Sequence, residues 1–209
     1  MMPTAEVSLR PTIRRRTEAR QQEIVLTVLA LAAEQGVDAI TTLAIAQHMG
    51  LTQGAVFRHF PNKEAIWSAV LDWLVEQMEA LFQTAEGLPP LLALERVFSA
   101  YMALFARYPA VPRLFFSDTF HHPYPRLHAR LQAMVRSCEG RLAGWIRQAQ
   151  KTGAIASVPA PAAAKLLLTC IQGLAFQSCV LGIVANPVAT GRQLFPLYLA
   201  VLGVTQVIP

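Results

Sequence analysis

Apolar side chains recur every three or four residues along most of the chain, which is the spacing of one face of an α-helix. In residues 17–35, for example, Ile24, Val28 and Ala32 fall on one side. The longest stripe, in residues 126–152, consists of Leu127, Leu131, Met134, Cys138, Leu142 and Trp145. No segment alternates apolar and polar residues as a half-buried strand would, so the pattern predicts an all-α fold.

Proline and glycine divide this pattern into about nine predicted helices. The predicted ranges are 17–35, a short pair within 42–60, 63–84, 91–107, 112–118, 126–152, 162–184 and 193–204. Between two of them, the sequence FHHPYP of residues 120–125 predicts a turn. Pro196 predicts that the last helix starts late or is kinked, because proline cannot donate a backbone hydrogen bond.

Residues 42–64 carry the most informative pattern, two short helical stretches around a glycine. Ala46 is small where the two helices would touch, and Gly50 suits a turn with a positive φ. Val56 is apolar where the second helix would face the core. This spacing predicts a helix-turn-helix, which places its second helix in the DNA major groove. The chain is therefore expected to be a DNA-binding regulator.

The residues around these two helices are good helix caps and stops. Thr41 or Thr42 can cap the first helix, and Thr52 can cap the second, which is expected over residues 53–60. Pro61 would end the second helix, and Asn62 would cap the next one.

The segment from about Arg20 to Leu74 resembles the N-terminal domain of the TetR family of transcriptional regulators. The residues that carry the resemblance are Leu31-Ala32-Ala33-Glu34-Gln35-Gly36, Thr41-Thr42, Ile45-Ala46, Gly50, Thr52, Gly54, Phe57, His59-Phe60 and Lys63-Glu64. The resemblance covers roughly a quarter of the chain. It implies a three-helix DNA-binding domain joined by a linking helix to a larger helical domain for ligand binding and dimerisation.

The resemblance also implies roles for single residues. Thr42, His59 and Lys63 would contact phosphates. The family usually has Tyr at position 57, whose hydroxyl reaches a phosphate, whereas this chain has Phe57. Either that contact is lost or Arg58 replaces it. The alternative for His59 is a surface histidine that packs locally.

Base recognition is expected from the start of the second helix of the motif. Gln53 can bind adenine through two hydrogen bonds, and the methyl group of Ala55 can contact a thymine methyl. Gly54 would permit close approach to the DNA. The complete set of candidate DNA-binding residues is Thr42, Thr52, Gln53, Gly54, Ala55, Phe57, Arg58, His59 and Lys63.

Three regions are predicted: a flexible basic arm over residues 1–16, the DNA-binding domain over 17–64, and the effector-binding and dimerisation domain over 65–209. The net charge of +5 favours nucleic acid, but residues 1–64 hold seven basic and six acidic side chains. The arm contains Arg14-Arg15-Arg16. It would either reach into a minor groove or act as a solvated tail.

The remaining positive charge lies further along the chain. Eight basic side chains occur from Arg107 to Lys151, against only Asp118 and Glu139. Two interpretations stay open: a solvated face of an amphipathic helix, or a surface that attracts an anionic effector or a second partner.

The resemblance implies a small-molecule effector in the C-terminal domain, and a hydrophobic or amphipathic compound is expected there. The candidate ligand-binding residues are Tyr101, Phe105, Phe116, His121, Trp145, Gln172 and Phe176. Aromatic residues at helical spacing are also typical of an ordinary core, so that alternative stays open.

The family pairs two C-terminal helices of each subunit, which implies a homodimer through residues 162–184 and 193–204. Residues 166–191 carry no charge and are long enough to cross a bilayer. Their scattered polar groups, such as Gln172 and Asn186, instead favour a buried helix or a protein interface. Without a signal peptide pattern, a cytoplasmic protein is expected, with no membrane contact.

The three cysteines, Cys138, Cys170 and Cys179, form no CxxC pair and are expected to be buried free thiols. The alternative is a redox or metal sensor with His121, His122 and His128 as extra ligands. No metal and no cofactor are expected. The chain has no nucleophile motif, phosphate loop or paired carboxylates, which argues against an enzyme.

The resemblance implies a repressor that binds a palindromic operator and is released by a ligand that shifts the linking helix. The alternative is a DNA-binding protein without an effector, whose C-terminal domain binds a protein partner.

Overall fold

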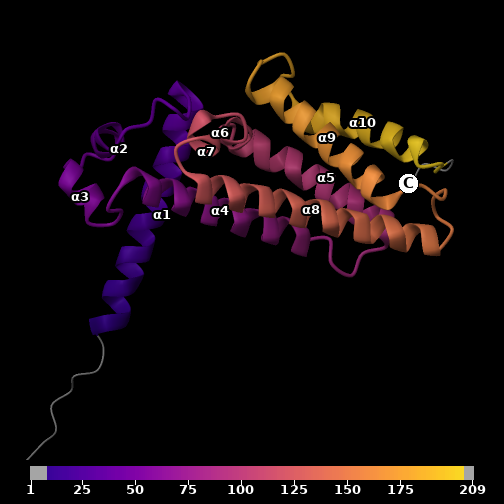
Figure 1. The fold of residues 1–209 in the computed structure, drawn as a ribbon, viewed down its shortest axis with the longest axis horizontal. Coiled ribbons are helices and arrows are strands. Elements are labelled where there is room, and N and C mark those ends of the chain that lie inside the picture. Colours follow the sequence, from indigo (N-terminus) through magenta and orange to yellow (C-terminus); the bar gives the residue numbers. More distant parts are fainter. Residues whose placement is uncertain (1–8, 205–209) are drawn as a thin grey trace, which may run out of the picture. The chain divides into compact units, whose positions relative to one another are not determined.

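The computed structural model describes residues 9–204, with side chains from residue 15 onward, and this part of the chain forms ten helices and no strand. Figure 1 shows their order. The helices are α1 (Leu9–Gln35), α2 (Thr42–His48), α3 (Gln53–Phe57), α4 (Lys63–Gln83), α5 (Pro90–Arg107), α6 (Ala110–Leu114), α7 (Asp118–His121), α8 (Pro125–Lys151), α9 (Ala160–Cys179) and α10 (Pro187–Val201). The all-α prediction is confirmed.

The chain divides into two compact units, with the boundary between Trp73 and Leu74 inside α4. From the sequence, we predicted the boundary between the DNA-binding and effector domains nine residues earlier, after Glu64. The first half of α4 belongs to the N-terminal unit, and its Ile66 and Val70 are buried. The functions assigned to the two regions stay predictions.

Helix α1 begins earlier than the sequence predicted. Residues 9–16, which were expected to belong to a flexible arm, form the first turns of α1, whereas residues 1–8 of that arm lie outside the described part. Pro11 is compatible with this start because the first four backbone N–H groups of a helix have no partner within it. Further along, Ile24, Val28 and Ala32 are buried as predicted.

The C-terminal unit contains two short helices, α6 and α7, where the sequence predicted one helix over residues 112–118. Helix α7 also takes up the first two residues of the predicted turn at 120–125. The last helix starts at Pro187, six residues earlier than expected, and includes Pro196. Its start is capped by Asn186, whose Oδ1 accepts a 2.9 Å hydrogen bond from the N–H of Ala189.

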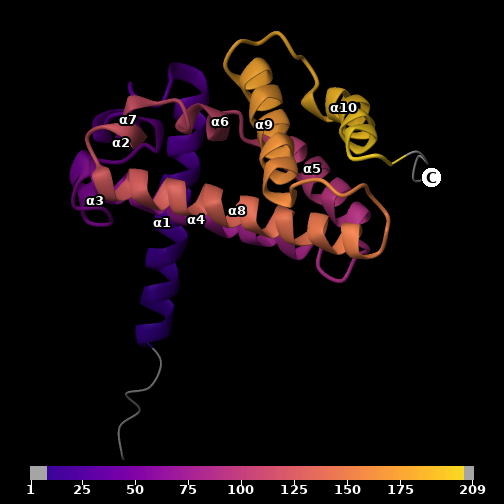
Figure 2. The same cartoon turned by 45° about the vertical axis from the view of Figure 1, so that its right-hand side comes forward.

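Helices α5, α8, α9 and α10 make the core of the C-terminal unit. Helix α8 packs against α5 and α9, and α10 packs against α5 and α9 (Figure 2). The contact between α10 and α5 is close at Gly191, because a Cβ atom there would lie 3.0 Å from side-chain atoms of Phe98 and Met102. Of the stripe predicted on α8, all members are buried except Trp145, which is partly exposed.

Within the described residues, α9 is the one helix long and apolar enough to cross a membrane. It is a packed helix of the C-terminal unit, however, with contacts to α5, α6, α8 and α10. Buried residues are spread along its length, from Ala160 to Cys179, although other residues of the helix are exposed. Its apolar composition is therefore accounted for in part by the core.

Candidate functional site

Helices α2 and α3 are joined by a tight turn with the predicted local chemistry. The Oγ1 atom of Thr41 accepts a 3.0 Å hydrogen bond from the N–H of Ala44, which makes Thr41, not Thr42, the cap of α2. Gly50 has φ = +64°, a conformation that costs glycine little. The N–H of Leu51 then donates to the carbonyl of Ala46 at 2.8 Å and closes the turn.

Helix α3 is short and is anchored by one fully buried side chain. Thr52 caps it, accepting a 3.2 Å hydrogen bond from the N–H of Ala55, and Val56 has no exposed surface. The helix ends at Phe57, three residues before the predicted end at Phe60. The last residues form a turn because the N–H of Phe60 is still bonded to Val56, and Pro61 cannot continue the ladder.

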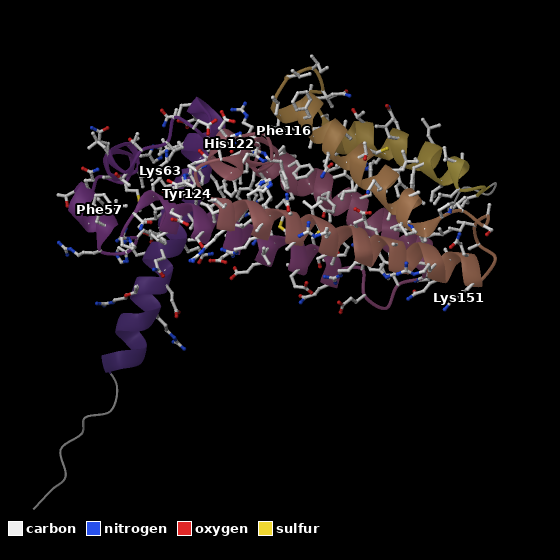
Figure 3. All side chains as sticks on the ribbon, in the orientation of Figure 1. Phe57, Lys63, Phe116, His122, Tyr124 and Lys151 are labelled. Atoms are coloured by element: carbon white, nitrogen blue, oxygen red, sulfur yellow. The ribbon has the colours of Figure 1, made fainter. Side chains whose placement is uncertain are left out.

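The opposite side of α3 is exposed. The exposed residues are Gln53, Gly54, Phe57 and Arg58, and Phe57 keeps 42% of its surface accessible although it is a large apolar residue. Figure 3 shows Phe57 on this helix of the N-terminal unit. The side chain of Gln53 is oriented by Thr42, since its Nε2 donates to the Thr42 Oγ1 at 2.7 Å. Two residues predicted to contact DNA are thus bonded to each other.

The remaining candidates lie beside α3. His59 is half-buried, its carbonyl accepts a 3.3 Å bond from Gln21 Nε2, and its Nδ1 is buried with no hydrogen-bond partner. That buried nitrogen cannot reach a phosphate. Lys63 is the first residue of α4, where Asn62 Oδ1 accepts from the N–H of Ala65 at 2.8 Å, as the sequence predicted for the cap. A cation at a helix N-terminus, with its free N–H groups, suits an anion.

The C-terminal unit contains a cavity of about 470 Å³. Its walls come from α4 to α9 and are mostly apolar. The polar residues that line it are His121, His128, Gln132, Arg136 and Gln172.

Five of the seven ligand-binding candidates line this cavity, namely Tyr101, Phe105, Phe116, His121 and Gln172. Trp145 and Phe176 are not among the lining residues. Trp145 is stacked on Phe82, with ring centroids 5.7 Å apart, and Phe176 packs edge-on against Phe116 at 5.0 Å. Trp145 thus packs on a core ring, whereas Phe176 contacts a residue that lines the cavity, and the roles of both in ligand binding stay predictions.

Sequence reasoning missed three polar lining residues on α8: His128, Gln132 and Arg136. Their regular spacing of four residues was a signal, because it puts all three on one face of a helix. That face was not recognised because the apolar stripe on the same helix dominates the pattern.

Part of the basic run is used inside the C-terminal unit. Arg141 pairs with Glu79 at 2.7 Å and Glu86 at 3.3 Å, and its guanidinium lies 4.3 Å from the ring centre of Phe82. Arg113 donates from Nε to the carbonyl of Cys179 at 2.8 Å. These contacts show that some of the basic side chains hold the C-terminal unit together. Neither a solvated helix face nor a binding surface therefore accounts for the whole run.

The three cysteines are free thiols. Cys138 and Cys179 are buried as predicted, and Cys170 is partly exposed. Burial raises the pKa of each thiol, which disfavours the reactive thiolate. Among the described residues, no three His, Cys, Asp or Glu side chains are grouped so that they could hold a metal ion.

Known proteins are similar to this chain in sequence and in fold. The family model for bacterial regulatory proteins of the tetR family matches residues 24–70. The nucleoid occlusion factor SlmA of Vibrio vulnificus is 24% identical over 135 residues, which is 63% of this chain and 69% of that protein.

Two solved structures illustrate the likeness in fold. A TetR transcription regulator from Haloarcula marismortui superposes with a TM-score of 0.76 at 20% identity, covering 88% of this chain and 98% of that one. The regulator FadR of Bacillus subtilis, solved in complex with stearoyl-CoA, has a TM-score of 0.69 at 17% identity, covering 86% and 97%.

The family match spans the helix-turn-helix, from the buried face of α1 through α2 and α3 into α4. The fold over the rest of the described chain is that of other regulators of this kind. The family is not one of enzymes, and it binds DNA through this motif. Residues 24–70 therefore match the DNA-binding domain of the TetR family of transcriptional regulators, and the described chain has the TetR fold.

Proposed function

We propose that the chain is a homodimeric repressor that binds a palindromic operator and is released by a small hydrophobic or amphipathic ligand. The observation that carries the proposal is the two-sided character of α3. Its buried Val56 fixes the helix in the N-terminal unit, while Gln53, Gly54 and Arg58 face solvent on the other side. A recognition helix needs such a surface to enter the major groove.

Within this proposal the candidate residues divide into two groups. Gln53, Ala55 and Arg58 would contact base edges. Phe57 would make an apolar contact, for example with the methyl group of a thymine. Thr42, Thr52, His59 and Lys63 would fix the position of the protein on the phosphates, with Gly54 allowing close approach. Because Gln53 is bonded to Thr42 without DNA, binding a base would require it to exchange this partner.

The dimer is proposed through α9 and α10. Leu194, Leu197 and Val201 share one face of α10 and are exposed, with 62% of Leu197 and 66% of Val201 accessible. Leu166 on α9 is also exposed. Exposed apolar side chains that share a helix face are typical of protein interfaces, and a two-fold axis would present two recognition helices to a palindrome.

The dimer can be tested by sedimentation velocity. Leu197→Lys is expected to convert the dimer to a monomer and to weaken operator binding strongly, because half-sites are then bound singly. Leu92→Lys, at an exposed leucine of α5, is the matched control and should remain dimeric. A dimeric Leu197→Lys would contradict the proposed interface.

The effector is proposed to bind in the cavity of the C-terminal unit. Its mostly apolar wall with a few polar groups is typical of ligand sites. Met78 of α4 contributes to this wall, and α4 begins at Lys63, so the proposed route of release is a ligand-dependent shift of α4. A ligand acts in this way only when it binds the two conformations with different affinity. FadR, which shares the fold, has stearoyl-CoA bound in its structure.

Selection of genomic fragments with the purified protein, at near-physiological salt, tests the repressor proposal. Recovery of fragments that share an inverted repeat supports it, and uniform recovery contradicts sequence-specific binding. Placing such a repeat over a promoter then gives the sign of regulation, because a repressor lowers transcription until an effector is added. A cytoplasmic location stays part of the proposal.

A second candidate function is a DNA-binding protein without an effector, whose C-terminal unit binds a protein. The observation that favours it is the similarity to SlmA, which is named as a nucleoid occlusion factor. A ligand screen that changes neither the melting temperature nor the operator affinity, together with recovery of a specific partner protein, would support this candidate over the first.

A further inference from the structure

The cavity of the C-terminal unit has one polar wall, formed by three side chains of α8. His128, Gln132 and Arg136 follow one another at intervals of four residues, and all three line the cavity. The Nη1 atom of Arg136 lies 3.4 Å from Gln132 Oε1, and Gln132 Nε2 lies 2.6 Å from His128 Nε2. These contacts make a chain of hydrogen bonds along the wall.

The direction of this chain follows from the chemistry of its members. A guanidinium group only donates, so Gln132 must present its amide oxygen to Arg136 and its NH₂ group to His128. The Nε2 atom of His128 therefore accepts, and the ring proton of the neutral imidazole is on Nδ1. Nδ1 is buried and has no hydrogen-bond partner. The wall thus holds a buried donor that lacks an acceptor.

The neighbouring histidine, His121, does not accept a hydrogen bond from His128 Nδ1. The ring of His121 lies across that of His128, with centroids 5.2 Å apart. Its Nε2 is 2.7 Å from the carbonyl of Phe115, so this nitrogen must donate. The Nδ1 atom of a neutral His121 is then an acceptor, but no hydrogen bond joins it to His128 Nδ1, which has no partner.

The charge of the cavity points in the same direction. Among the described residues that line it there is one cation, Arg136, and no Asp or Glu. Arg136 is exposed, whereas Leu131, Phe105 and Ile171 are buried lining residues. A ligand would thus meet a cationic edge and an apolar interior.

We propose that this cavity takes an amphiphile with one anionic head group, such as a long-chain carboxylate or phosphate ester. Arg136, whose guanidinium is hydrogen-bonded to Gln132, binds oxygen atoms of the head, and the apolar chain lies among α5, α8 and α9. The proposal rests on the effector role proposed above and specifies the chemical class of the effector. Hydrogen bonds that involve a charged group are among the stronger ones, which makes the head group a source of selectivity.

The test is direct binding, measured by isothermal titration calorimetry on the full chain without DNA. Four probes share a twelve-carbon chain and differ in the head: dodecanoate, dodecyl phosphate, dodecanol and dodecyltrimethylammonium, all used below the concentration at which they form micelles. We expect one of the two anions, or both, to bind about tenfold more tightly than dodecanol. Comparison of the two anions separates a carboxylate from a phosphate.

Two variants locate the head group. Arg136→Gln removes the cation, and His128→Phe keeps a ring of similar size but removes the Nε2 acceptor that holds Gln132 and, through it, Arg136. Each is expected to bring the affinities for the preferred anion and for dodecanol close together. Arg147→Gln is the matched control, since Arg147 is an exposed arginine of the same helix that does not line the cavity. Arg136 is exposed as well, so its variant tests the proposal even if His128→Phe fails to fold.

Several results would overturn the proposal. These are equal or tighter binding of dodecanol, preference for the cationic probe, an anion preference that survives in both variants, or no binding of any probe. None of them affects the recovery of an operator by fragment selection, which uses no ligand. The failure of this inference and the failure of the proposed DNA-binding function are therefore separate observations.

Discussion

The two units of the chain hold their candidate sites in different ways. The N-terminal unit presents a surface made by neighbours in sequence, with Gln53, Gly54, Phe57 and Arg58 on and beside one five-residue helix. The C-terminal unit instead encloses a cavity whose lining runs from Met78 to Ala175. A site on one short helix leaves a local sequence pattern, whereas a cavity between helices depends on contacts distant in sequence.

The largest effect is expected from a charge placed under α3. Val56→Asp puts an unpaired carboxylate at a fully buried position and should cost roughly 4 kcal/mol or more of the free energy of unfolding of the N-terminal unit. If the comparison between the units holds, calorimetry will show an early or missing N-terminal transition and an unchanged C-terminal one. Loss of both transitions together would mean that the units unfold as one.

Two glycines in the helix-turn-helix separate backbone strain from DNA contact. Gly50→Ala should cost about 1–2 kcal/mol of stability, because φ is +64° and the cost is one of conformation, with no atom within 4 Å of the added Cβ. Gly54→Ala lies in ordinary helical space and should leave stability equal or higher by up to about 1 kcal/mol. Its expected loss is in operator affinity. Urea denaturation and fluorescence anisotropy with operator DNA measure the two effects.

Two polar residues separate base recognition from phosphate contact on the proposed DNA-binding surface. Gln53→Ala should change the preferred base at one position of each half-site, by roughly 1–3 kcal/mol. Lys63→Ala should weaken binding to all sequences and lower the salt slope by about one. Binding to a set of single-base variants of the operator, measured over a range of salt concentrations, tests both. A Lys63→Ala variant with unchanged affinity and slope would remove this residue from the contact set.

The smallest effect concerns the interior of the C-terminal unit at high pH. Burial raises the pKa of Tyr101 well above its ordinary 10.0 and also raises that of Cys138 from its ordinary 9.0. The unfolded chain therefore loses these protons at lower pH than the folded chain does, and stability falls as the pH rises above about 9. Tyr101→Phe should make this fall shallower. An identical pH dependence in the variant would indicate that other groups control it.

The same contrast between the units explains which predictions from the sequence succeeded. The caps at Thr52 and Asn62 and the turn at Gly50 were found because each depends on residues within four positions. The polar wall formed by His128, Gln132 and Arg136 was missed, since nothing in α8 alone says which of its faces borders a cavity.

The predicted helix bounds were wrong where they rested only on the low helix propensity of proline. Residues around Pro11 were expected to lie outside a helix, and Pro196 was expected to delay or kink one. Pro11 is tolerated in the first turn, where no backbone donor is needed. Pro196 lies within α10, where burial of Phe195, Tyr198 and Leu199 against the unit holds the helix together. Tertiary packing overrode local preference there.

The close approach of α10 to α5 at Gly191 has a consequence for how this sequence can evolve. A methyl group at position 191 would meet Phe98 and Met102 at 3.0 Å, so either the helices separate or one of those side chains becomes smaller. Positions 98, 102 and 191 are therefore expected to change together among related chains. A homologue with alanine in place of Gly191 should carry a compensating reduction on α5, and engineering of α10 has to respect the same coupling.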